Sequence, residues 1–252
     1  DASYSNTTGY GNSALGKDSL RSNQTGYFNT IVGRQAGYDY TGNEAVAMGY
    51  RALYENVTGT GNTAIGTKSM LGASGQSHSN NTAVGYESMY SVTTANGSAG
   101  LGHQSLRALT SGGSNTGVGN SAAYSVTTGV ENTALGQTAL FYNVTGNYNT
   151  AIGRSAMYGV SGNSHEFNTA VGRSSLQGIT TGEKNTAVGY LSLKSLTSAD
   201  NITALGTEAL EFLTTGANNV AVGYRAGRNL TTSQDNVIVG YQAGENVGSS
   251  TD

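Results

Sequence analysis

The sequence lacks cysteine, proline and tryptophan, and only 11% of its 252 residues are charged. Without cysteine the chain can form neither disulfides nor thiolate metal sites. The net charge of −3 and the lack of any Lys/Arg cluster argue against binding to nucleic acid. No apolar run approaches the roughly 20 residues of a membrane-spanning helix, so we expect no membrane insertion.

The sequence is instead rich in glycine, with 38 residues of this type, and in Asn, Ser and Thr. Its hydrophobic fraction of 36% is too high, and too regularly placed, for a disordered polar tract. Glycine does not fall at every third position, which together with the lack of proline excludes a collagen helix.

A short repeat accounts for this composition. The unit reads Asn-Thr-Ala-Val-Gly-x-x-Ser-Leu, followed by a spacer and a Thr-Gly turn, and it occurs in fourteen copies. The repeat glycines are Gly16, Gly33, Gly49, Gly66, Gly85, Gly102, Gly119, Gly136, Gly153, Gly172, Gly189, Gly206, Gly223 and Gly240. Nothing marks a domain boundary, so residues 1–252 are predicted to form one continuous repeat domain.

The step between repeat glycines is 17 residues in all but three cases. Gly33 to Gly49 is one residue shorter, and the steps after Gly66 and Gly153 are each two residues longer. The two long steps carry similar inserts, Ser74–His78 and Ser161–His165. We interpret this as the duplication of a five-repeat block, residues 66–152 and 153–239.

Each position of the repeat predicts a structural role. The residue before the glycine is always apolar, as in Leu15 and Val188, so we expect this column to point into a continuous core. The residue two before the glycine is mostly Ala, and the residue three after it is always Ala or Ser, which indicates close packing. The repeat glycine itself is expected to take a positive φ or to permit close backbone approach at a corner. Thr-Gly pairs such as Thr181-Gly182 would close the second corner.

These features favour an all-β fold, a tandem-repeat β-solenoid or β-roll, because helical solenoids need units of about 33 residues or more. The Asn-Thr-Ala-Val stretch is strand-like, while the segment after the glycine suits a short helical turn as well as a strand. Asn at the first repeat position either forms a ladder along the stack or merely serves a turn. Fourteen coils would make a rod of about 65 Å. Because one thin coil buries little, the small-residue columns favour a homotrimer with a shared core.

The repeat resembles a known group of sequences. Residues 81–89, Asn-Thr-Ala-Val-Gly-Tyr-Glu-Ser-Met, and residues 185–193 are similar to the repeats of bacteriophage and giant-virus tail-fibre proteins. They are also similar to the head repeats of trimeric autotransporter adhesins, whose core motif is Ser-Val-Ala-Ile-Gly. The resemblance implies a trimeric shaft that carries or contributes receptor-binding surface. The adhesin repeat is a few residues shorter, and no heptad stalk or membrane anchor is found here.

No arrangement of residues in the sequence predicts catalysis. The histidines His78, His103 and His165 have no consistent acidic partner, and the carboxylates are scattered singly. We therefore expect no enzymatic activity, no cofactor and no metal site. His78 and His165 sit in equivalent inserts, where a solvated loop position is the favoured interpretation over a ligand role.

The position directly after the repeat glycine is the candidate recognition surface. It holds Tyr50, Tyr86, Tyr190, Tyr224 and Tyr241, with Arg34, Arg154 and Arg173 in other copies. Such an array suits stacking on a cell-surface glycan or on a protein receptor. The alternative, which the sequence favours, is that each Tyr covers the small Ala/Ser column of its neighbour.

Asn-x-Ser/Thr sequons provide candidate glycosylation sites. Five of them precede a Thr-Gly or Thr-Thr corner, which should be exposed: Asn6, Asn23, Asn56, Asn143 and Asn229. A glycoprotein is feasible if the source organism glycosylates secreted proteins.

Three functions are compatible with the sequence. The first is a structural extracellular fibre module, of tail-fibre shaft or adhesin head type, that presents a surface for attachment. The second is a subunit of an extracellular filament that polymerises end to end, because neither end of the sequence looks capped. The third and least favoured is an ice-binding solenoid, since no flat Thr-x-Thr ladder is evident.

Overall fold

The computed structural model describes residues 1–246, which form a β-solenoid built from fourteen short parallel strands. The described chain contains no helix, so the fold is all-β as expected. It comprises two compact units, Asp1–Val130 and Glu131–Asp252. Each strand is three residues long and ends directly before a repeat glycine.

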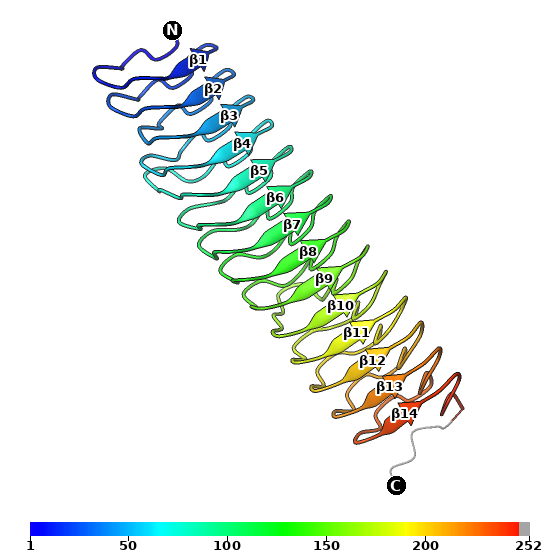
Figure 1. Ribbon diagram of the computed structural model, residues 1–252. Coiled ribbons are helices and arrows are strands. Elements are labelled where there is room, and N and C mark those ends of the chain that lie inside the picture. Colours follow the sequence, from blue (N-terminus) through cyan, green and yellow to red (C-terminus); the bar gives the residue numbers. More distant parts are fainter. Residues whose placement is uncertain (247–252) are drawn as a thin grey trace. The chain divides into compact units, whose positions relative to one another are not determined.

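The first unit contains strands β1 to β7, which pair in sequence order, each with the next (Figure 1). Their bounds are β1 Ser13–Leu15, β2 Thr30–Val32, β3 Val46–Met48, β4 Thr63–Ile65, β5 Thr82–Val84, β6 Ala99–Leu101 and β7 Thr116–Val118. Equivalent repeat positions are direct partners, as in Thr63↔Thr82 and Ile65↔Val84. The repeat period is therefore also the period of the stack.

The second unit repeats this arrangement with strands β8 to β14. Their bounds are β8 Thr133–Leu135, β9 Thr150–Ile152, β10 Thr169–Val171, β11 Thr186–Val188, β12 Thr203–Leu205, β13 Val220–Val222 and β14 Val237–Val239. The 19-residue step after Gly153 leaves the register intact, because Ile152 pairs with Val171. The two extra residues are accommodated outside the strands, within the turns that follow the glycine.

The glycine corner requires glycine for two reasons. All fourteen repeat glycines have φ between 124° and 142°, a region that side chains disfavour. In addition, a Cβ at Gly189 would lie 2.4 Å from the carbonyl oxygen of Gly206 in the next coil. Both expectations for this position are confirmed.

The segment after the glycine is neither a strand nor a helical turn. It is a run of turns in which the second and fourth residues have positive φ, as in Gln104 and Leu106. These turns still join neighbouring coils, because the Leu106 N–H donates to the Ala122 carbonyl at 2.9 Å. Backbone hydrogen bonding between coils thus continues beyond the three-residue strands.

The core holds the small-residue columns and the residue four after the glycine. Ala151, Ala156 and Met157 in the second unit are all fully buried. Their burial is complete within the chain, so the expectation that these columns contact a partner is wrong. The inner face of the strand holds Ala or Gly in most coils, and the larger Ile31 is buried there in β2, beside Gly37.

The apolar column before the glycine lies on the opposite, outer face of the strands. Leu15 is 69% exposed, Ile65 36% and Leu101 39%, and the other members are exposed or half-buried. The expectation that this column points into the core is therefore wrong. Side chains alternate along a strand, and with Ala inside, the larger neighbours must face outward.

The Asn residues at the first repeat position form a ladder and also serve the corners, so both of the roles that the sequence left open are found. The Asn185 backbone N–H donates to Asn168 Oδ1 at 2.9 Å, and the Ile202 N–H donates to Asn185 Oδ1 at 3.0 Å. Asn185 Nδ2 donates to the Ala199 carbonyl of the next corner at 2.9 Å. Most of these amides are buried, with Asn12 and Asn236 half-buried, and they join neighbouring coils, which leaves little unsatisfied polarity in the interior.

We predict that Gly189→Ala destabilises the second unit by more than about 3 kcal/mol, from backbone strain and overpacking together. Gly162→Ala is the matched control, because Gly162 also has a positive φ but has no atom within 4 Å of the point where an alanine methyl group would lie. Denaturant unfolding of both variants measures the difference. Equal destabilisation would mean that contact between glycine corners is unimportant.

Candidate functional site

The residues directly after the repeat glycines, which we call the post-glycine column, are exposed at one edge of the sheet of each unit. Tyr86 is 44% exposed and Tyr190 is 42% exposed. Tyr50, Tyr241, Arg34, Arg154 and Arg173 are exposed as well, and Tyr224 is half-buried. The structure therefore brings the predicted recognition residues into one line within each unit.

Members of the post-glycine column contact each other from coil to coil. The Tyr86 and His103 rings stack at 5.4 Å, as do those of Tyr224 and Tyr241. Each of the arginines Arg34 and Arg173 places its guanidinium carbon 5.9 Å from a neighbouring Tyr ring. The Ala/Ser column lies inside the coil, so the interpretation that each Tyr covers that column is wrong.

A second column of aromatic and guanidinium groups was missed by the sequence analysis. It lies five residues after the repeat glycine, and its half-buried members stack in the same way. The Arg107 guanidinium carbon lies 5.0 Å from the Tyr90 ring and 5.7 Å from the Tyr124 ring. The Phe141 and Tyr158 rings stack at 5.2 Å. The recurrence of Tyr, Phe and Arg at this spacing was the available signal.

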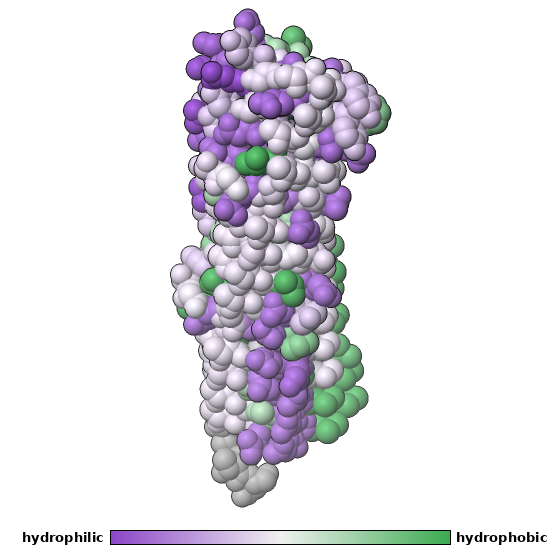
Figure 2. Space-filling view, turned by 90° about the vertical axis from the view of Figure 1, so that its left-hand side faces the viewer, coloured by the Kyte–Doolittle hydropathy of each residue, from purple (hydrophilic) through white to green (hydrophobic). Residues whose placement is uncertain are grey.

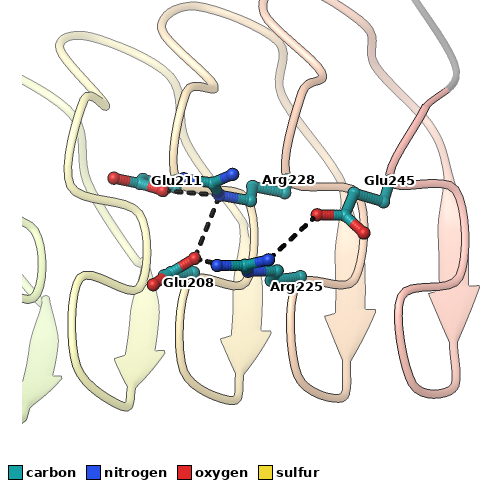
Figure 3. A network of polar contacts seen from close by, with 5 residues as sticks. All are labelled: Glu208, Glu211, Arg225, Arg228 and Glu245. Carbon is teal, nitrogen blue, oxygen red and sulfur yellow. Dashed lines mark hydrogen bonds and ion pairs between the residues drawn. The ribbon is translucent and has the colours of Figure 1, made fainter.

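Charged groups of the second unit form a compact network near its C-terminal coils (Figure 3). Arg225 Nε lies 2.7 Å from Glu208 Oε2, and its Nη1 lies 3.7 Å from Glu245 Oε1. Arg228 Nε contacts both Glu208 and Glu211, at 3.1 and 2.8 Å. Opposite charges therefore alternate along neighbouring coils, and these carboxylates are engaged in ion pairs.

Glu87 is the corresponding buried acid of the first unit. It accepts hydrogen bonds from Arg107 Nε at 3.0 Å and from Gln104 Nε2 at 3.1 Å. Burial alone raises the pKa of this carboxyl, but the hydrogen bonds from Gln104, Arg107 and Tyr86 outweigh it and hold the pKa below its ordinary value. Glu87 therefore stays ionised at neutral pH. Within residues 1–246, no three His, Asp or Glu side chains gather closely enough to hold a metal ion.

The two insert histidines are buried, contrary to the expectation of solvated loop positions. His78 occupies the corner position that Gly59 holds in the preceding coil, and His165 occupies the one that Gly146 holds. Their rings lie buried within the coils that the two-residue inserts widen. The Nε2 atoms of both rings lack a hydrogen-bond partner. Burial lowers the pKa of each imidazole to about 4, so both are neutral at pH 7.

Three of the five candidate glycosylation asparagines are inaccessible. Asn23, Asn56 and Asn143 are fully buried, and Asn56 and Asn143 hydrogen-bond to the backbone of their corner. The expectation that these corner side chains are exposed is therefore wrong. Asn6 and Asn229 are exposed, and their glycosylation stays a prediction.

Comparisons with models of protein families, with curated proteins and with solved structures found no match. Across residues 1–246 there is no helical segment with the length and apolar character that a membrane crossing requires.

The buried histidines predict an acid-sensitive stability. Their folded pKa of about 4 lies below the ordinary 6.5, so the unfolded chain binds more protons between these values, and stability falls as pH drops through this range. We expect each histidine to remove about 2 kcal/mol of unfolding free energy between pH 7 and pH 5.

Denaturant unfolding at the two pH values, for the wild type and for the His78→Leu/His165→Leu variant, measures this effect. The variant should lose most of the pH dependence. His103→Leu is the control, because it removes a histidine from an exposed position, and the loss of pH dependence should be larger in the His78→Leu/His165→Leu variant than in this control. A wild type equally stable at pH 5 and pH 7 would contradict the prediction.

Proposed function

We propose that this chain is a structural, non-catalytic module of an extracellular fibre, which associates laterally with further copies and presents a surface for attachment. The observation that carries the proposal is the outer face of the short strands. It consists of an apolar column before the glycine and a column of mostly Thr, Val and Ser two residues earlier. Neither column contains a charged residue.

An uncharged apolar strip of this kind is unusual on the surface of a protein that remains alone in water. Figure 2 shows hydrophobic surface gathered at one margin of the C-terminal coils, beside a hydrophilic area. Burying the exposed part of each aliphatic side chain would contribute about 0.5–1 kcal/mol, and one strip repeats this contribution in every coil. A second copy matches the strip best, because it offers the same spacing between coils.

The sequence likeness to tail-fibre repeats supports the extracellular setting of this proposal, and the exposed post-glycine column supports the attachment role. Trimerisation is the form of lateral association that the same likeness suggests. Weak contacts along the post-glycine column would add through avidity on a repetitive surface such as a glycan.

We predict that the wild type is oligomeric in solution and that Ile65→Asp/Leu101→Asp shifts it toward the monomer. Carboxylates on the outer face would have to lose their hydration in the contact, while both positions stay solvated in a monomer. Sedimentation analysis over a range of concentrations measures the mass, and electron microscopy shows whether association is lateral or end to end.

Thr94→Asp/Ser111→Asp is the matched control, because it adds the same charge at exposed corner positions of the same unit. It should leave the mass unchanged. A wild type that stays monomeric at every concentration, or a control that dissociates as readily, would overturn lateral association through the outer face.

A further inference from the structure

Two arginines of the post-glycine column stand side by side in consecutive coils. Strands β9 and β10 pair in register, so Arg154 and Arg173 follow equivalent glycines and are direct neighbours along the column. Both side chains are exposed. Tyr190 follows in the next coil, with its ring centroid 5.9 Å from the Arg173 guanidinium carbon.

The positive charge of this pair is not compensated locally. Neither arginine has an ion-pair partner among the described residues, and the residues that follow them are Ser155 and Ser174. The arginines of the Glu208 network, by contrast, each contact at least one carboxylate. Like charges placed opposite each other destabilise a sheet, so this pair has no evident role in folding.

The same arrangement occurs in the first unit. Lys17, Arg34 and Tyr50 occupy three consecutive positions of its post-glycine column, and the Arg34 guanidinium carbon again lies 5.9 Å from the Tyr ring. Here Asp18 follows Lys17, so the first-unit version carries an acid close to its cations. Two adjacent cations followed by a tyrosine therefore appear twice, with matching geometry.

We infer that Arg154, Arg173 and Tyr190 bind an acidic glycan, with a sulfate or carboxylate group held by both guanidiniums. Planar guanidinium groups suit such oxyanions because they offer paired N–H donors. The neighbouring Tyr190 ring provides an apolar surface against which the sugar that carries the anion can pack. The inference rests on the proposed attachment role and specifies its ligand class.

The chemistry favours a glycan over nucleic acid. A pair of guanidiniums on a chain of net charge −3 can hold one or two anionic groups, whereas a phosphate backbone requires a longer basic track. Because two cations followed by a tyrosine occur in both units, one glycan polymer, or several glycan chains on one surface, would engage more than one site.

The test measures binding of the full chain to four probes by calorimetry at low and at physiological salt. The four probes are a heparin-derived oligosaccharide for sulfate, a hyaluronan oligosaccharide for carboxylate, dextran as the neutral glycan, and a single-stranded DNA oligonucleotide. We expect binding to at least one acidic oligosaccharide, weakened by salt, and none to dextran. Arg154→Gln/Arg173→Gln should raise its Kd about tenfold or more.

Arg225→Gln/Arg228→Gln is the matched control, because it removes the same charge from arginines already paired with carboxylates, and it should leave the Kd unchanged. The inference would be overturned if neither acidic oligosaccharide binds, or if DNA binds as tightly as either of them. It would also be overturned if the two variants lose equal affinity for the oligosaccharide. Oligomer mass, measured on the same samples, tests the structural role separately. That mass should be the same for the wild type and for Arg154→Gln/Arg173→Gln.

Discussion

Close contact between the backbones of consecutive glycine corners is the constraint on which the remaining structure depends. Within a unit, each repeat glycine lies so near the repeat glycine of the next coil that no side chain fits between them, and all of them share one backbone conformation. The coils of a unit can therefore stack in one register only. The buried Asn ladder reinforces that register, because each amide bonds to the backbone of a neighbouring coil.

A fixed register turns every repeat position into a column. Inside the coil this produces columns of Ala, Ser and Leu or Met, and outside it produces columns of apolar, aromatic and charged side chains. The outer columns differ in what they can bind: the strand face offers uncharged apolar surface, while the post-glycine column offers rings and guanidiniums. Assembly and attachment can thus use different faces of one coil, and both surfaces repeat with the same spacing.

Much of the fold could be predicted from the repeat alone. The period, a strand directly before the glycine, and the special backbone of Gly189 and its equivalents follow from residue type and spacing, whereas the Asn ladder was one of two roles that the sequence left open. Which side of each strand faces the core could not be predicted in the same way. The strict apolar column indicated a core, whereas the inner side of the thin coil holds mostly Ala, and residues such as Ile65 and Leu101 lie outside.

The candidate site was predicted in part. The exposed Tyr and Arg residues after the glycine were identified from their recurrence, and the structure places them together. Burial of His78, Asn23 and Asn143 could not be predicted, because polar residues at corners are usually solvated. Here a widened coil accommodates His78 and a backbone partner accommodates Asn143, whereas Asn23 is buried with no hydrogen-bond partner for its amide. The uncompensated charge of Arg154 and Arg173 becomes apparent only when neighbouring coils are compared.

Deletion of one complete repeat tests the central role of register most directly. Removing Asn185–Asn201 takes out one 17-residue period and should leave a folded chain with native circular dichroism and a modestly lower Tm, because each coil contacts only its neighbours. Removing Asn185–Ser192 instead places turn residues opposite strand residues and should abolish cooperative unfolding of the second unit. Equal tolerance of the two deletions would contradict the account.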